Sequence, residues 1–381
     1  MAPEIVSISS IANTPAKSVA KPRLISVDVF RGISVAAMIL VNDPGDRSHV
    51  YWPLAHAEWN GWTPTDLIFP FFLFIVGISI VLSFSSRCAT GATKSELLAH
   101  SLKRSAIIFA LGLFLSAYPV FDPHSTRIPG VLQRIALVYL ATSVIVLYTR
   151  RKTRYILCLA ILLGYWGLMA LVPVPGHGAG VLTIDGSLAG YIDRKLLYNH
   201  LYMPYTFDPE GLLSTLPAIA SCLFGVFAGE WMQGMGGERI RKLLISASIL
   251  VIAGQIWNIW FPINKHLWTS SYVLLSAGAA MAGLALCYWT IDVRGWRRWA
   301  QPFVWYGVNP LALYFFAVML ARTVNQYTIH GTSLRELVFR AFYLRLVANP
   351  YVASMLYGLS YVLLFCLIAW ALFRKNVFIR V

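Results

Sequence analysis

The chain has 381 residues, of which 58% are hydrophobic and only 12% are charged. A soluble domain carries about a quarter charged residues, so this composition excludes an ordinary soluble protein and indicates an integral membrane protein. The net charge of +15 can suggest nucleic-acid binding, but the basic residues fall in short clusters between apolar stretches. Membrane proteins that follow the positive-inside rule show this distribution, so we expect no nucleic-acid partner.

The apolar stretches predict an all-α, polytopic membrane protein, because they run to about 20 residues, which is the length that crosses a bilayer as a helix. The pattern of short alternating segments that is typical of a membrane β-barrel is not seen. About ten spans are expected, at residues 31–42 (with an alternative start near 26), 65–84, 104–121, 128–149, 155–172, 212–229, 243–261, 272–291, 302–321 and 352–373. Residues 1–22 are expected to form a disordered cytosolic tail, followed by a single membrane domain over residues 23–381.

The basic residues between the spans predict which side of the membrane each connection faces. Connections rich in Lys and Arg, such as residues 150–154, alternate with connections that hold few. The positive-inside rule places the rich connections, and therefore both termini, in the cytosol. Residues 322–350 break the pattern, because this expected outer connection holds four arginines. Ser333 and Glu336 form a candidate capping box there, so a helix lying on the membrane surface would fit, as would an error in the last two spans.

The five cysteines are widely spaced, with no CxxC pair and no nearby histidine. Most of them lie in apolar runs, where cysteine behaves as a small buried hydrophobe. The sequence therefore predicts neither a metal site nor a disulfide framework.

Polar residues directly before the second span are the strongest candidates for chemistry. Residues 56–66 (HAEWNGWTPTD) place His56 in a loop, with Thr63 as the predicted helix N-cap and Asp66 at the third helical position. A neutral imidazole there could take a proton from an amine or attack a thioester, and it could equally be an ordinary solvated histidine. Asp66 is placed to orient His56 or to hold an ammonium group, although the helix dipole also favours an acid at this position.

The first span carries polar residues at both ends. Asn42, its last residue, could orient His56 or bind a developing oxyanion, or it could simply cap the helix. Asp28 and Arg31 share a helix face at the cytosolic end. An ion pair between them is one interpretation, and contact of Arg31 with phosphate groups is the other.

Two polar residues are expected inside later spans. Arg134 should face the interior of the bundle, because a charged side chain is costly in lipid. Asn309 precedes Pro310, which should kink the ninth span. Both could line a pocket, and packing contacts between helices explain them equally well. Asn264 and Lys265 lie at the outer end of the seventh span, where the lysine could meet an anionic ligand or remain solvated.

Four blocks of the sequence resemble one known family. They are RLISVDVFRG (23–32), HAEWNGWTPTDLIFPFFLFIVG (56–77), FDPEGLLSTLPAIASCLFG (207–225) and FPINKHLWTSSYVLLSAG (261–278). Together they are similar to the membrane core of the heparan-alpha-glucosaminide N-acetyltransferase family, whose members move acetyl groups from acetyl-CoA to amino sugars. The resemblance matches His56 to the family's active-site histidine and Asn42 to a position implicated in activity. It implies a compact bacterial relative in the inner membrane, whose acceptor need not be heparan sulfate.

The resemblance therefore predicts a transmembrane acyltransferase that carries an acetyl group from cytosolic acetyl-CoA to an extracytosolic amino sugar or glycan. His56, Asn42 and Asp66 would be catalytic, with His56 acting either as a base in a ternary complex or as an acetylated nucleophile. The residues expected to hold acetyl-CoA are Arg31, Arg104, Arg134 and Asn309, and those expected to hold the acceptor are Glu58, Trp59, Asn60, Asn264 and Lys265.

Two other functions fit the same polar residues. One is a transporter or permease for amino sugars or oligosaccharides, with these residues forming a binding site near the middle of the membrane. The other is a subunit that scaffolds enzymes of the cell envelope. No inverted repeat of the spans is visible in the sequence, which weakens the transporter hypothesis without excluding it. Membrane lipid is the expected surrounding of the chain, and a homodimer is an open alternative to a monomer.

Overall fold

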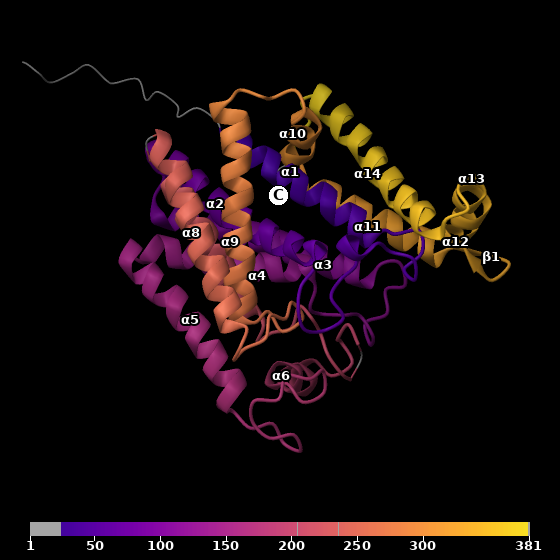
Figure 1. Ribbon diagram of the computed structural model, residues 1–381, viewed down its shortest axis with the longest axis horizontal. Helices are drawn as coiled ribbons and strands as arrows, with labels where there is room; N and C mark the ends of the chain where they lie inside the picture. Colours follow the sequence, from indigo (N-terminus) through magenta and orange to yellow (C-terminus); the bar gives the residue numbers. More distant parts are fainter. Residues whose placement is uncertain (1–23, 204, 235, 380–381) are drawn as a thin grey trace, which may run out of the picture.

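The computed structural model describes residues 24–379 apart from residues 204 and 235, and this part of the chain is mostly helical (Figure 1). The tail predicted for residues 1–22 lies outside the described residues. Nine of the described helices are long and apolar enough to cross a membrane, and a tenth span results if one bent pair is counted. This confirms the prediction of an all-α, polytopic membrane protein with about ten spans. The cytosolic placement of both termini stays a prediction.

The long helices follow the expected order along the chain. They are α1 (Ile25–Asn42), α2 (Ile68–Ala89), α3 (Lys94–Ala117), α4 (Val131–Tyr148), α5 (Arg151–Leu171), α7 (Thr215–Met232), α8 (Gly236–Trp257), α9 (Ser270–Cys287) and α14 (Pro350–Arg374). The bent pair is α10 (Gln301–Val308) and α11 (Pro310–Gln326). The shorter elements are two 3-10 turns (Trp52–Leu54 and Pro64–Leu67), α6 (Leu188–Leu197), two π-helical turns (Tyr288–Val293 and Phe339–Tyr343), α12 (Leu334–Val338), α13 (Leu344–Leu346), β1 (Thr328–Ile329) and β2 (Thr332–Ser333).

The first and third spans begin earlier than their main predicted starts at residues 31 and 104. Helix α1 begins at Ile25, in agreement with the alternative start near residue 26. Helix α3 begins at Lys94 because Thr93 and Glu96 form a capping box, in which each side chain accepts a hydrogen bond from the other residue's backbone N–H. The charged first turns of α3 are therefore helical although their hydropathy is too low to predict a span, because the capping box satisfies the exposed N–H groups at the start of the helix.

The ninth span is broken where the sequence predicts a kink. Helices α10 and α11 are bent by 86° at Asn309, directly before Pro310. Proline has no N–H to continue the helical hydrogen bonds, and its ring clashes with the preceding turn. The Asn309 side chain binds the chain's C-terminal segment instead, since Nδ2 donates to the Val377 carbonyl (2.9 Å) and Oδ1 accepts from Ile379 N–H (2.8 Å).

The segment between α11 and α14 is a hairpin followed by short helical pieces. Strands β1 and β2 pair antiparallel, and Ser333 then caps α12 by accepting a hydrogen bond from Glu336 N–H. The predicted N-cap is therefore confirmed. The suggested surface helix is instead divided into α12, a π-helical turn and α13, and Arg322 belongs to the last turns of α11 rather than to the connection.

Glycines allow two helix pairs to approach until their backbones touch. Between α2 and α7, Gly77 lies against the Cys222 carbonyl, and Gly225 lies against the Phe74 carbonyl. Helices α1 and α10 use the same reciprocal arrangement. Small residues at such positions let membrane helices pack closely, which compensates for the missing hydrophobic driving force in lipid.

We expect Gly225→Ala to destabilise the protein, because the added Cβ would lie 1.8 Å from the Phe74 carbonyl oxygen. Overpacking of this kind costs about 1–3 kcal/mol or more. Thermal unfolding of the purified protein in detergent measures the effect. Gly164→Ala in α5 is the matched control, since nothing lies within 4 Å of its added Cβ. Equal unfolding temperatures for the two variants would contradict the close packing of α2 on α7.

Candidate active site

The connection before α2 lies against the connection between α8 and α9. Gly61 N–H donates to the Ile263 carbonyl at 2.7 Å, and Asn264 Nδ2 donates to Asn60 Oδ1 at 3.1 Å. Asn264 is buried, and its Oδ1 accepts from Leu267 N–H. Its whole amide is therefore used to shape the loop and to position Asn60.

Trp59 joins a third connection, which contains α6, to the same place. Its indole N–H donates to the Leu182 carbonyl at 2.8 Å. Its ring stacks on His266, with 5.3 Å between the centroids, and meets Phe207 edge-on. These loops and α6 gather at the end of the bundle that is lowest in Figure 1. Four of the residues predicted to hold the acceptor (Trp59, Asn60, Asn264 and Lys265) therefore share one neighbourhood.

Asp66 holds His56 in a defined orientation. The Asp66 carboxylate is buried, and Oδ1 lies 2.7 Å from His56 Nδ1. Oδ2 accepts hydrogen bonds from the N–H groups of Ala57 (3.1 Å) and Thr63 (3.0 Å). Thr63 is therefore the N-cap, as predicted, and Asp66 at the third helical position completes a capping box with it. Because a carboxylate faces Nδ1, we assign the proton of the neutral ring to that nitrogen. The lone pair of Nε2 is then available to a substrate.

Lys265 lies beside both members of this pair. Its Nζ is 2.9 Å from His56 Nδ1, 3.4 Å from His56 Nε2 and 3.4 Å from Asp66 Oδ1. The Lys265 side chain is 16% exposed, whereas the His56 side chain is 44% exposed. Burial lowers the pKa of Lys265, and the carboxylates of Asp66 and Glu210 act in the opposite direction. His56 is therefore the solvent-facing member of a trio of titratable residues, His56, Asp66 and Lys265.

Helix α9 and Arg134 pack close to the trio inside the bundle. Tyr272 donates to the backbone carbonyl of Asp66. The neighbouring Trp268 packs edge-on against Tyr272, and the Arg134 guanidinium lies 4.9 Å from the Trp268 ring centroid. Arg134 is only 1% exposed and also donates to the Gly211 carbonyl at 3.2 Å. It faces the interior of the bundle, as predicted.

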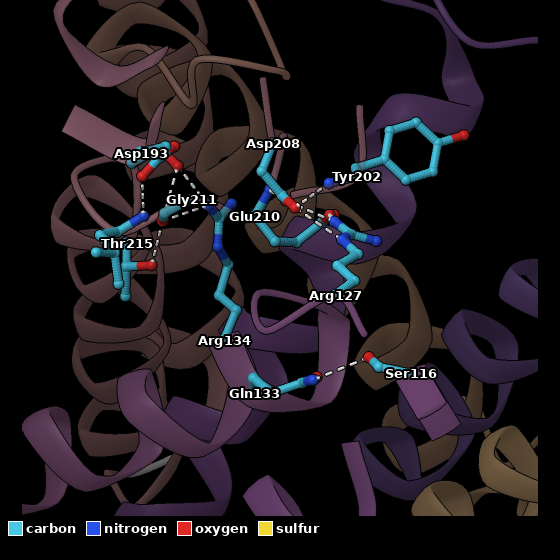
Figure 2. Close-up of polar contacts among 12 residues, drawn as sticks. Ser116, Arg127, Gln133, Arg134, Asp193, Tyr202, Asp208, Glu210, Gly211 and Thr215 are labelled. Atoms are coloured by element: carbon cyan, nitrogen blue, oxygen red, sulfur yellow. Dashed lines mark hydrogen bonds and ion pairs between the residues drawn. The ribbon is translucent and has the colours of Figure 1, made fainter. Parts of the chain in front are cut away.

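A cluster of acids around the α6 connection was not predicted from the sequence. Arg127 forms ion pairs with Asp208 and Glu210, and all three are shown in Figure 2. Asp193 of α6 is also buried, accepts a hydrogen bond from Leu212 N–H, and has its pKa raised to about 7 by burial. Glu210 matters to the trio, because its charge acts on Lys265. The signal available in the sequence was the FDPEGLL block, which places two acids at the end of the long connection between α5 and α7.

A second polar space follows α2 away from the trio. This cavity of about 320 Å³ is lined on α2 by residues from Phe72 to Arg87. A helix rises about 1.5 Å per residue, so these residues cover roughly 20 Å of the helix axis. Its basic lining residues are Arg31, Arg87, His100 and Arg104. Two of the residues predicted to hold acetyl-CoA, Arg31 and Arg104, therefore meet in one cavity.

The arginines of the cavity are held by neighbouring helices. Arg31 donates to Asp28 (3.0 Å), which confirms the predicted contact, and to Ser79 Oγ on α2 (2.9 Å). The Arg104 guanidinium lies 5.1 Å from the ring centroid of Tyr139. The other two residues predicted for acetyl-CoA point elsewhere, since Arg134 packs on Trp268 and Asn309 binds the C-terminal segment.

Asn42 and Glu58 are both exposed. Within residues 24–379 (without 204 and 235), neither side chain has a hydrogen-bond partner. Both are therefore open to a bound molecule, and no direct hydrogen bond connects Asn42 with His56.

Comparison with known proteins gives one consistent result. The family model described as heparan-alpha-glucosaminide N-acetyltransferase, catalytic, matches residues 23–260. The chain is 33% identical over 352 residues to the heparan-alpha-glucosaminide N-acetyltransferase of Homo sapiens, and 31% identical over 350 residues to that of Mus musculus. Each match covers 77% of this chain and about half of the relative (52% and 53%). The chain therefore belongs to the heparan-alpha-glucosaminide N-acetyltransferase catalytic family.

Proposed function

We propose that this chain is an acetyltransferase that moves the acetyl group of acetyl-CoA to an extracytosolic amino sugar. The observation that carries the proposal is the exposed imidazole of His56, oriented by the buried carboxylate of Asp66 at a distance of 2.7 Å. A carboxylate that binds Nδ1–H leaves Nε2 as a base of defined direction. Family membership supports the reaction class, and the two ends of α2 supply the two binding sites that such a reaction needs.

The reaction can be written with the groups of this site. The amine nitrogen of the acceptor attacks the thioester carbonyl, and His56 Nε2 takes the proton that the nitrogen loses. The carbon–sulfur bond then breaks, and the proton passes to the thiolate of CoA. The exposed amide of Asn42 is assigned to the oxyanion that develops on the carbonyl. An acetylated His56 is the alternative course, since an imidazole can itself attack a thioester.

Acetyl-CoA is proposed to occupy the cavity along α2. Its phosphates would meet Arg31 and Arg104, because guanidinium groups bind phosphate through charge-assisted hydrogen bonds. Arg87 and His100 line the same cavity and add to its positive character. The pantetheine arm is long and flexible, so it would follow α2 toward Asp66 and bring the thioester to His56.

The acceptor is proposed to lie on the loops around Trp59. An indole ring suits the apolar face of a sugar, and the exposed carboxylate of Glu58 suits an ammonium group. Asn60, positioned by Asn264, offers hydrogen bonds to hydroxyl groups. A glucosamine-type acceptor fits this combination. A bacterial inner-membrane location and a homodimer stay predictions.

Acetyl transfer in sealed proteoliposomes of known orientation tests the proposal. Acetyl-CoA supplied on the cytosolic face should yield CoA on that face and N-acetylglucosamine from glucosamine supplied only on the other face. Mass spectrometry measures both products. Movement of unmodified glucosamine without release of CoA would identify a transporter instead. Turnover that requires both substrates on one face would retain the enzyme and remove the transmembrane route.

A further inference from the structure

The position of the Lys265 ammonium relative to the ring of His56 is unusual. The two nitrogens of an imidazole point in different directions in the ring plane. An atom along the lone pair of Nδ1 would therefore be much farther from Nε2 than from Nδ1. The Lys265 Nζ is 2.9 Å from one nitrogen and 3.4 Å from the other, so it lies over the face of the ring. Lys265 therefore blocks neither in-plane direction, so Asp66 can face Nδ1 while Nε2 stays open to a substrate.

We infer that Lys265 is a positioning residue that keeps the imidazole of His56 uncharged and ready to accept a proton, rather than a binding residue for an anionic substrate. This inference rests on the proposed function and adds the means by which the base is kept active. A cation over the face of a neutral aromatic ring is attracted to it. The same cation repels an imidazolium, because two like charges at this distance disfavour ionisation of the second group.

The consequence for the reaction is a short-lived imidazolium. When Nε2 takes the proton from the acceptor nitrogen, Asp66 stabilises the resulting charge and Lys265 opposes it. The proton then moves readily to the CoA thiolate as the carbon–sulfur bond breaks. The net reaction is amine plus acetyl-CoA to amide plus CoA, and His56 ends in its neutral form. The opposing effects of the Asp66 carboxylate and the Lys265 ammonium on the imidazolium let His56 both accept and release a proton in each reaction cycle.

Other charged groups around the trio do not replace Lys265. Asp66 of the turn before α2 is the acid that binds the ring, and Glu58 of the same loop is exposed. Glu210, from the connection after α6, acts on Lys265 and helps to keep it protonated. Burial and the charge of Lys265 lower the pKa of His266, which keeps this neighbouring ring neutral. Of these charged and titratable groups, Lys265 is therefore the cation that faces His56.

The pH dependence of activity tests the inference. Lys265→Met removes the charge that opposes an imidazolium, so the loss of activity on acidification should occur at a higher pH than in wild type. Lys265→Arg keeps a cation and should keep the wild-type profile. Lys242→Met is the matched control, because Lys242 pairs with Glu238 on the surface of α8. If Lys265→Met loses activity at the same acidic pH as wild type, the inference is overturned.

A measurement without turnover separates this inference from the proposed function. Diethylpyrocarbonate modifies an imidazole only when the ring is neutral, and mass spectrometry follows the peptide that contains His56 in the full-length protein. Its modification rate should fall at higher pH in Lys265→Met than in wild type or in Lys242→Met. Coincident curves for these proteins would overturn the inference, even if acetyl transfer is established. A shifted curve in a protein without acetyl transfer would support it while removing the proposed function.

Discussion

His56→Ala is expected to lower kcat/KM for acetyl transfer by roughly 10²–10⁴-fold, the contribution typical of a positioned general base. Acetyl-CoA binding should persist, because the basic cavity along α2 is separate from His56. Steady-state kinetics and calorimetry measure the two quantities. Asp66→Asn should also reduce turnover strongly, since an amide can stabilise the wrong tautomer of the ring.

The connection that contains His56 offers a matched control for this substitution. His49 has Nδ1 2.7 Å from Asp46 Oδ2, and its side chain is 39% exposed, so its local setting resembles that of His56. It contacts the α14 residue Tyr351 rather than Lys265. His49→Ala should therefore retain activity. A folded His56→Ala protein with the turnover of His49→Ala would remove the proposed mechanism, whichever step limits the rate.

Arg104→Ala is expected to weaken acetyl-CoA binding by roughly 10- to 100-fold, because a hydrogen bond to a charged group contributes about 1.5–3 kcal/mol. The change should appear in Kd measured by calorimetry. Arg31→Gln should act in the same direction, although its contacts with Asp28 and Ser79 also support the packing of α1 on α2. The loss should diminish at high salt, since phosphate contacts are electrostatic.

Acetyl-pantetheine provides the control for the arginine variants, because it carries the thioester without the nucleotide phosphates. Wild type and Arg104→Ala should use this donor equally well. Arg241→Ala, which changes an exposed arginine of α8, should leave both donors unaffected. Equal losses with acetyl-CoA and acetyl-pantetheine would place Arg104 outside the phosphate site and would reassign the cavity.

Local features of the fold were predictable from the sequence. The spans follow from hydropathy, because each helix satisfies its own backbone hydrogen bonds in lipid and needs about 20 apolar residues to cross. The Thr63–Asp66 capping box and the break at Pro310 depend on neighbouring residues alone. The short helix α6 was missed, since ten residues within a polar connection lack the apolar length of a span.

The candidate site was only partly predictable. The HAEWNG segment marks His56, and the spacing to Asp66 predicts their pairing, because both lie on one short loop and its following turn. The sequence could not tell whether Asn309 lines a pocket or packs helices. In the structure the Asn309 amide forms hydrogen bonds with the backbone of residues 377 and 379. This contact could not be predicted, because it depends on the path of the C-terminal segment.

The membrane class, the approximate number of spans and the chemical identity of the candidate base could be predicted from the sequence, because these properties depend on composition and short-range spacing. The residues that surround the base could be identified only from the folded structure. Lys265 is 209 residues from His56, and the basic cavity joins residues of α1, α2 and α3. Such contacts arise from helix packing and loop pairing, in which the Gly77 and Gly225 contacts set how closely α2 and α7 approach. Spacing along the chain carries no information about these distances.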